Sequence, residues 1–346
     1  MTTTGLSREA ILESSDPHPA FQEIAAAQGG KPSLPSDVDI LTLRNVTNTA
    51  KAKARESNGP PPSGLTERDI EIPMRDGTKI LAHVYSPSEG ADDNELPLFV
   101  FFHGGGFCIG NRHDDWKSNR AIALRNRVVV ISPEYRLAPE YPFPYAVHDG
   151  LDAVQWVAAN ARVVHPLASP SAGLIVGGTS SGGNVANAVV YLNRDQEYPV
   201  KVTGQFLSVP PLLPPPVVPE KYRPDYISFG SNKQYSIPSG DIVSLFMGAY
   251  RPDITSPLMV PINHPSGHSG VPPTYFQVCG LDGLRDENLI YERILREENS
   301  VPTLLHFYPG LPHHFWEFYP QLTEEAEKRT EDTIRGLQWL LEIGLR

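Results

Sequence analysis

The chain has 346 residues, of which 40% are hydrophobic and 20% charged, as expected of a globular protein with a large core. Its formal net charge of −11 makes nucleic acid and anionic membrane surfaces unfavourable partners. No apolar stretch approaches the roughly 18–20 residues that span a bilayer, and two cysteines cannot form a disulfide framework.

The first segment, residues 1–58, contains two helix-like stretches, 6–14 and 35–54, and no alternation typical of strands. It lacks a basic start followed by an apolar core of secretory length. With the low cysteine content, this pattern predicts a cytoplasmic protein. The proline-rich stretch 59–64 then breaks the chain.

Strand-like and helix-like stretches alternate in the rest of the chain. Residues 66–74 and 78–86 flank a turn and predict a β-hairpin. Six apolar runs typical of buried strands follow, at 96–102, 127–132, 172–178, 202–209, 273–279 and 302–308. Helix-like stretches separate most of them, at 115–126, 146–161, 180–195, 288–299 and 323–346. This alternation predicts a mostly parallel eight-stranded sheet flanked by helices. The proline-rich interval 210–262, with one helix expected at 239–250, is interpreted as an insertion above the sheet.

One predicted strand leads directly into glycines around two adjacent serines. Residues 178–182 fit G-x-S-x-G, the sharp strand-to-helix turn that lifts a serine hydroxyl off a sheet. Ser180 has glycine two residues away on both sides, whereas Ser181 has Thr179 on one side, so we predict Ser180 as the nucleophile. Dinucleotide and P-loop phosphate patterns do not fit these residues. A tight turn with incidental serines stays open on this motif alone.

A second glycine motif, HGGG at residues 103–106, directly follows a predicted buried strand. In this architecture such a segment supplies backbone N–H groups to an oxyanion hole. Glycines suit that role because a substrate carbonyl can approach amides that no Cβ shields. The alternative is a strand-ending turn. His103 has no partner at a metal-ligand spacing, and the HEXXH motif is absent.

Two later strand ends offer the acid and the base of a serine hydrolase, whose triad follows the order serine, acid, histidine. The run 273–279 is followed by Asp282 and Asp286, and the last run by His313 and His314. Both ends lie at the same sheet edge as the serine turn. Two acids and two histidines stay open at this point.

Over residues 67–345 the chain resembles the hormone-sensitive-lipase-like carboxylesterases of the α/β-hydrolase superfamily. The resemblance rests on five blocks, which are HGGGF (103–107), EYRLAPEYPFPYA (134–146), GTSSGG (178–183), DGLRDE (282–287) and GLPHHF (310–315). The last two align with the family's D-P-L-R-D-E and G-x-x-H-G-F, which selects Asp282 as acid and His313 as base. The resemblance also implies an oxyanion hole formed by the N–H groups of Gly105, Gly106 and Ser181.

The chain departs from the family pattern near the chemistry. Thr179 stands in place of an acid, Ser181 in place of an alanine, and His314 in place of a glycine. Position 181 contributes its backbone N–H, so its hydroxyl is not required. We expect Asp286 to make local contacts at a helix start rather than to serve as the triad acid.

The resemblance implies an α/β-hydrolase fold with a helical cap. Residues 1–66 would form an N-terminal cap segment, and residues 67–346 a catalytic domain with a cap insertion at about 210–262. Such a cap can close a pocket and exclude water. Candidate pocket residues, for which packing within the cap is the alternative, are Phe107, Phe246, Met247, Tyr250 and His314.

The implied activity is that of a serine carboxylesterase acting through an acyl-enzyme on Ser180, without metal or organic cofactor. We expect short- to medium-chain acyl esters of a bulky natural product, in secondary metabolism, as substrates. The edge run 302–308 favours a homodimer. Two alternatives stay open: a small-molecule receptor on the same fold, and an acyltransferase that uses the oxyanion hole with an acceptor other than water.

Overall fold

The computed structural model describes residues 5–27, 38–88, 94–235 and 238–345. Its centre is an eight-stranded sheet in the order β1-β2-β4-β3-β5-β6-β7-β8. The pairs β1–β2 and β2–β4 are antiparallel, and all later pairs are parallel. The predicted mostly parallel sheet is therefore confirmed. Its strands are β1 (Leu65–Pro73), β2 (Lys79–Pro87), β3 (Leu98–Phe102), β4 (Val129–Pro133), β5 (Leu174–Thr179), β6 (Gly204–Ser208), β7 (Thr274–Cys279) and β8 (Thr303–Tyr308).

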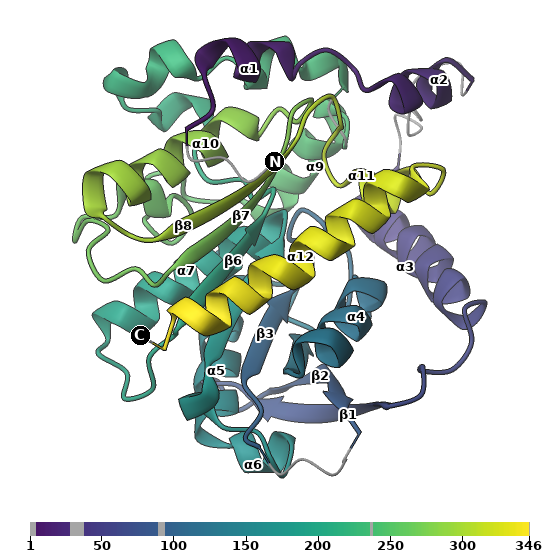
Figure 1. The fold of residues 1–346 in the computed structure, drawn as a ribbon, viewed down its shortest axis with the longest axis vertical. Helices are drawn as coiled ribbons and strands as arrows, with labels where there is room; N and C mark the ends of the chain where they lie inside the picture. The colour runs from purple at the N-terminus through teal and green to yellow at the C-terminus, as the bar shows by residue number, and fades with distance from the viewer. Residues whose placement is uncertain (1–4, 28–37, 89–93, 236–237, 346) are drawn as a thin grey trace.

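Helices cover both faces of this sheet, and successive strand residues point to opposite layers. Phe99 and Phe101 pack in the layer that contains α4 and α12, whereas Val100 and Phe102 pack in the opposite layer. In Figure 1, α12 and α4 cross in front of the sheet, and α5 and α7 lie behind it. The helices of the two layers are α4 (Trp116–Asn126) and α12 (Thr323–Ile343), then α5 (Tyr145–Ala159), α7 (Ser181–Asp195) and α10 (Arg285–Arg293).

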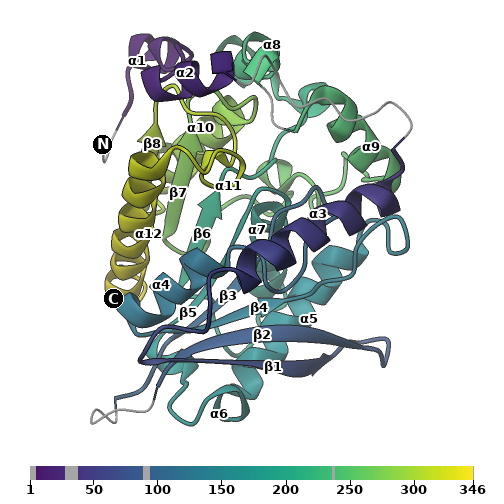
Figure 2. The ribbon, with the colours of Figure 1, turned by 90° about the vertical axis from the view of Figure 1, so that its right-hand side faces the viewer.

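Most of the remaining helices gather above the carboxyl ends of the parallel strands (Figures 1 and 2). They come from both predicted parts of the cap, residues 1–66 and about 210–262, and α3 packs against α9. They are α1 (Arg8–Glu13), α2 (Pro19–Ala27), α3 (Ile40–Glu56), α8 (Ser228–Ser231) and α9 (Gly240–Tyr250). The predicted cap ranges include residues 1–4, 28–37 and 236–237, which lie outside the described residues.

Short elements complete the chain. The 3₁₀ turns are η1 (Pro170–Ala172), η2 (Pro215–Val217), η3 (Glu220–Asp225), η4 (Lys233–Tyr235) and η5 (Pro261–Asn263), and the short helices are α6 (Ala161–Val164) and α11 (Phe315–Phe318). A π-helical turn, η6 (Ile294–Glu298), continues α10.

Two helices begin well away from the residue at which the sequence predicted their start, and one helix was not predicted. The helix expected over 35–54 begins at Ile40, because the Asp39 carboxylate caps the N–H groups of Leu41 and Thr42. Residues 35–37 of that prediction lie outside the described residues. The helix expected from 288 already begins at Arg285. Helix α2 was not predicted, since its nine residues bury only Phe21 and carry little periodic signal.

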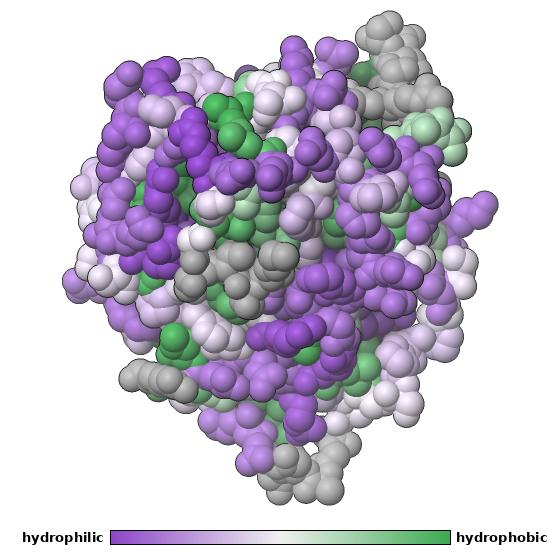
Figure 3. Space-filling view, turned by 45° about the horizontal axis from the view of Figure 1, so that its top comes forward, coloured by the Kyte–Doolittle hydropathy of each residue, from purple (hydrophilic) through white to green (hydrophobic). Residues whose placement is uncertain are grey.

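The surface above the strand ends is mainly hydrophilic, with small separate hydrophobic patches (Figure 3). The exposed large hydrophobic residues come from many different elements, for example Leu12, Val46 and Phe229. Among the described helices, none is both long and apolar enough to cross a membrane.

Candidate active site

Ser180 occupies the sharp turn between β5 and α7. Its backbone has φ 52° and ψ −125°, a conformation that non-glycine residues rarely adopt. The flanking glycines permit this turn: a Cβ on Gly178 would lie 2.5 Å from the carbonyl carbon of Gly182, and a Cβ on Gly182 would lie 2.1 Å from the Phe102 carbonyl oxygen. Strand β3, the turn and α7 therefore pass each other at backbone distance, and the serine side chain is lifted from the sheet edge.

The structure brings Ser180, His313 and Asp282 into one chain of side-chain contacts. Nε2 of His313 lies 3.0 Å from Oγ of Ser180, and its Nδ1 lies 2.6 Å from Oδ2 of Asp282. Both His313 and Asp282 are buried. The other Asp282 oxygen accepts the Leu284 N–H at 2.9 Å. The acid thus fixes the imidazole ring, with one nitrogen facing the serine hydroxyl.

Asp286, the other acid that the spacing left open, takes no part in the contacts that join Ser180, His313 and Asp282. Its carboxylate accepts the N–H groups of Ile227 and Ser228, and an ion pair joins it to Arg285 at 2.7 Å. This agrees with the expected local role at a helix start. Asp286 therefore ties the cap insertion to α10.

His314 points to a different acid from His313. Its Nε2 lies 3.7 Å from Oδ1 of Asp115, and its ring packs against Trp316 and Phe318. Burial favours the neutral acid, but His314, Arg329 and Lys51 outweigh it and lower the pKa of Asp115 to about 2. The second histidine is therefore held beside the site by its own carboxylate.

The glycine segment after β3 lies next to the serine turn, since a Cβ on Gly104 would be 3.4 Å from the Ser180 Cβ. Gly105 and Gly106 have φ of 128° and 60°, and within the described residues their N–H groups meet no acceptor. Ser181 is the first residue of α7, so its N–H has no intrahelical acceptor. A Cβ on Gly105 would lie 2.1 Å from the Ile109 carbonyl oxygen. Only glycine fits this conformation.

The buried side chain of His103 packs against this glycine segment. Its Nδ1 lies 2.8 Å from the Gly104 carbonyl oxygen, and its ring stacks on Tyr135, whose hydroxyl donates to the His103 carbonyl at 2.8 Å. Burial lowers the pKa of His103. The neutral imidazole thus packs beneath the glycines and holds their turn.

Aromatic residues of the cap insertion cover the glycine segment. The Phe246 ring lies directly over Gly106, where an added Cβ would be 2.1 Å from it. Tyr250 stacks on Phe107 at a centroid distance of 3.9 Å. Met247 is partly buried against the same hydrophobic cluster. Of the predicted pocket residues, Phe246 thus covers Gly106 of the glycine segment, while Phe107 and Tyr250 stack on each other.

The N-terminal segment holds the loops that carry the acid and the base, a role that the sequence did not predict. Nη1 of the fully buried Arg285 donates to the Ile11 carbonyl at 3.0 Å and to the Ser15 hydroxyl at 2.7 Å. Gly310, three residues before His313, donates its N–H to the Ser14 carbonyl and accepts the His18 N–H. Segment Ile11–His18 therefore binds both loops.

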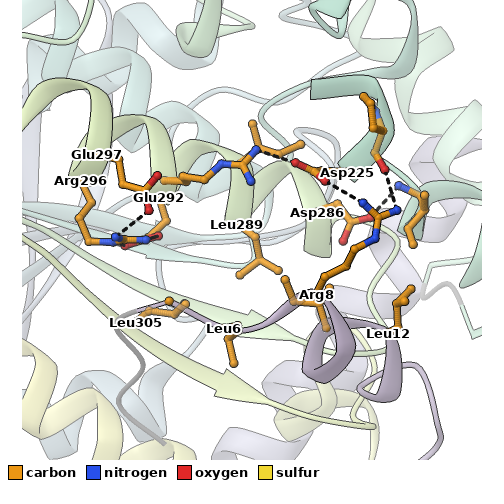
Figure 4. Close-up of a pocket in the computed structure, with 16 residues that line it drawn as sticks. Leu6, Arg8, Leu12, Asp225, Asp286, Leu289, Glu292, Arg296, Glu297 and Leu305 are labelled. Atoms are coloured by element: carbon orange, nitrogen blue, oxygen red, sulfur yellow. Dashed lines mark hydrogen bonds and ion pairs between the residues drawn. The ribbon is translucent and has the colours of Figure 1, made fainter. Parts of the chain in front are cut away.

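A cavity of about 360 Å³ lies beside this segment, with Leu6, Arg8 and Leu12 in its lining (Figure 4). Its lining combines apolar side chains, among them Leu6, Leu289 and Leu305, with arginines and acids. These cations are paired with acids: Asp225 with Arg8 and Arg293, and Glu292 with Arg296. The cavity therefore presents no unpaired charge among its described residues, and the triad residues do not line it.

Comparison with known proteins identifies the family. A family model described as alpha/beta hydrolase fold matches residues 99–317. The chain is 35% identical to an AB hydrolase superfamily protein of Schizosaccharomyces pombe, over 88% of both chains. It is 30% identical to a versiconal hemiacetal acetate esterase of Dothistroma septosporum, over 80% of both. It is 32% identical to the carboxylesterase NlhH of Mycobacterium tuberculosis, over 78% of this chain and 84% of that one.

Solved structures agree with this result. Vibralactone cyclase matches with a TM-score of 0.85 and 29% identity over the whole of both chains. A hyperthermophilic esterase from the archaeon Pyrobaculum calidifontis matches with a TM-score of 0.78 and 30% identity, over 94% of this chain and 99% of that one. The chain belongs to the α/β-hydrolase family. The predicted resemblance to its esterases and the predicted enzyme class, a carboxylic ester hydrolase, are confirmed.

Proposed function

We propose that the protein hydrolyses carboxylic esters through an acyl-enzyme on Ser180. The observation that carries this proposal is the contact chain from Ser180 through His313 to Asp282, with separations of 3.0 and 2.6 Å. In the first step His313 accepts the hydroxyl proton at Nε2 while Oγ attacks the ester carbonyl. Asp282 holds the tautomer with the proton on Nδ1 and stabilises the imidazolium that forms.

The developing oxyanion is the second requirement of this chemistry. We assign its stabilisation to the N–H groups of Gly105, Gly106 and Ser181, because within the described part of the chain they meet no other acceptor and because they belong to the segments at the serine turn. Collapse of the intermediate transfers the His313 proton to the leaving alcohol. Water then attacks the acyl-enzyme with His313 as base, and the carboxylic acid leaves Ser180 with its hydroxyl restored.

The proposed substrate is a short- to medium-chain acyl ester of a bulky natural product. Two features support this class. The relative from Dothistroma septosporum is named a versiconal hemiacetal acetate esterase. In this chain, Phe246 lies over Gly106, which places an aromatic wall against the oxyanion segment. Action in secondary metabolism, a cytoplasmic location and a homodimer belong to the same proposal; β8, the strand predicted to pair, is at the edge of the sheet.

Acyl transfer to an acceptor other than water is the second candidate. Its support is the similarity along the whole chain to a protein named a cyclase. The two candidates share the acyl-enzyme and differ in the group that attacks it. The receptor alternative has less support, because serine, histidine and acid are all present and in contact.

Pre-steady-state kinetics test the proposal. We expect p-nitrophenyl acetate and butyrate to give a burst of nitrophenolate, followed by slower turnover, in the wild-type protein. The Ser180→Ala variant should be folded and show no burst, whereas the matched Ser181→Ala variant should retain it. A burst in Ser180→Ala would contradict the assignment of the nucleophile. If added alcohols speed the second phase and form new esters, this result would favour acyl transfer over hydrolysis as the function.

A further inference from the structure

A cluster of two histidines and one aspartate lies at the antiparallel edge of the sheet, apart from the triad. Asp69 of β1 and His83 of β2 are direct partners across the hairpin. His113, from the segment between β3 and α4, adds the third side chain. One ligand-type atom from each of the three lies within 4.8 Å of the other two. Figures 1 and 2 show this edge beside α4 and α3.

Direct contacts join the three side chains. Nδ1 of His83 lies 2.6 Å from Oδ1 of Asp69. The His83 and His113 rings meet edge to face, with centroids 4.5 Å apart. Nδ1 of His113 is buried and has no hydrogen-bond partner among the described residues. A buried nitrogen without a partner is costly and calls for a ligand.

The contacts around the cluster are of the kind that orients metal ligands. The second nitrogen of His83 lies 3.4 Å from Glu67, the carboxylate–histidine arrangement that commonly lies behind a metal site. The second oxygen of Asp69 accepts from Arg112 at 2.9 Å. Nε2 of His83 and Oδ2 of Asp69 thus have partners of their own, whereas Nδ1 of His83 and Oδ1 of Asp69 face each other.

The local charge permits a cation. Three guanidinium groups lie close by, those of Arg55, Arg112 and Arg120. The carboxylates of Glu67, Asp69 and Glu134 pair with them. Three positive and three negative groups leave no excess of positive charge to repel a metal ion.

We propose that Asp69, His83 and His113 form a binding site for a divalent transition-metal ion of the zinc class. Two imidazole nitrogens and one carboxylate oxygen suit zinc, with bonds of about 2.0 to 2.2 Å and water in the fourth position. The metal takes the place of the proton between Nδ1 of His83 and Oδ1 of Asp69. These two atoms move somewhat apart to make room for the metal. Asp69 can follow, because its side chain is partly exposed.

The site has a structural role. It ties the β1–β2 hairpin to the segment that continues from the glycines 104–106, and no step of ester hydrolysis passes through it. The metal site is therefore independent of the proposed ester hydrolysis. Its readouts are metal binding and stability, which do not depend on turnover.

Titration calorimetry with Zn²⁺ on the full, metal-free chain tests the site. We expect one equivalent to bind, with an affinity at least tenfold weaker in His113→Asn and in Asp69→Asn. His148→Asn, a histidine of α5 outside the cluster, serves as the matched control and should bind as the wild type does. Zn²⁺ should also raise the melting temperature of the wild type and of His148→Asn, but not of Asp69→Asn.

Co²⁺ provides a measurement that needs no variant, since coordination by the two imidazoles should give visible absorption bands that Zn²⁺ abolishes. The absence of saturable Zn²⁺ binding and of Co²⁺ bands would overturn the proposal. Equal Zn²⁺ affinity in the wild type and His113→Asn would also overturn it, by placing any bound metal elsewhere.

Discussion

The two sides of the active site contact different segments of the cap. On the acid–base side, the loops that carry Asp282 and His313 are bound by hydrogen bonds from the N-terminal segment, through Arg285 and Gly310. On the oxyanion side, the glycines after β3 are covered by aromatic rings of α9, with Phe246 on Gly106.

This difference matches what each side must do. Proton transfer needs donor and acceptor within hydrogen-bond reach, and directional contacts hold the loops at that distance. An oxyanion hole needs amides free of other acceptors and shielded from water, which apolar rings provide without competing for the N–H groups. We infer that both sides serve the chemistry, and that the aromatic cover of the oxyanion side in addition influences the choice of substrate.

The largest expected effect separates the two acids that follow β7. Asp282→Asn should lower kcat by about 10⁴-fold, because the amide favours the wrong imidazole tautomer. Asp286→Asn, the matched control, should cost far less activity and should mainly lower stability, since its carboxylate binds backbone N–H groups of the cap. Steady-state kinetics and thermal melts on both variants check this. Equal losses of kcat would contradict the assigned roles.

The oxyanion side should be the next most sensitive. Gly106→Ala places a Cβ 2.1 Å from the Phe246 ring and strains a φ of 60°, so we expect kcat to fall by about 10² to 10³-fold. Gly248→Ala in α9, where an added Cβ meets nothing within 4 Å, should leave kcat unchanged. Adding Phe246→Ala to Gly106→Ala should recover part of the loss. No recovery would mean that strain at Gly106, and not the aromatic contact, decides the geometry.

A smaller effect is expected from the N-terminal segment. Ser15→Ala removes one hydrogen bond to Arg285, at 2.7 Å, and should destabilise the protein by about 1 kcal/mol. Because this bond supports the acid loop, kcat should fall by up to about fivefold with KM nearly unchanged. Ser57→Ala, at the end of α3, removes a hydrogen bond remote from both loops and should keep the wild-type kcat. A change in KM alone would place the effect in the cap rather than in the loop.

The last prediction concerns stability rather than activity, and it involves pH and the buried Glu287. Burial raises the pKa of Glu287 to about 8 from an ordinary 4.5, although it accepts N–H groups of Leu212 and Leu213. The folded state therefore holds this proton more tightly than the unfolded state. Its contribution to stability is complete below about pH 4.5 and is lost as the pH rises toward 8.

Glu287→Gln should accordingly flatten the dependence of unfolding free energy on pH between pH 5 and 8, while the exposed Glu71→Gln should not. Urea denaturation at several pH values measures the slope. An unchanged slope in Glu287→Gln would show that Glu287 is already ionised in the folded protein.

Local sequence signals predicted the sheet and much of the candidate site. Each buried strand is a short apolar run, and the glycine turn at 178–182 requires its pattern for steric reasons that act within a few residues. The sequence did not predict contacts that join distant segments. Arg285 meets Ile11 across more than 270 positions, and no pattern near either residue signals this contact.

The adjacent histidines show the same limit. Spacing and resemblance favoured His313, but only the fold places Asp282 against His313 and Asp115 against His314. Likewise, the sequence named Phe246 and Tyr250 together, although one lies over Gly106 and the other stacks on Phe107. Which side of an aromatic cluster faces a site is decided by packing between elements.

Labelling with a fluorophosphonate tests the central claim most directly. Such a reagent is attacked only by a serine that an adjacent base activates and whose developing charge is stabilised. Peptide mapping by mass spectrometry should place a single adduct on Ser180, with none on Ser181, and Asp282→Asn should slow its formation. An adduct on another residue, or none on the folded protein, would contradict the account.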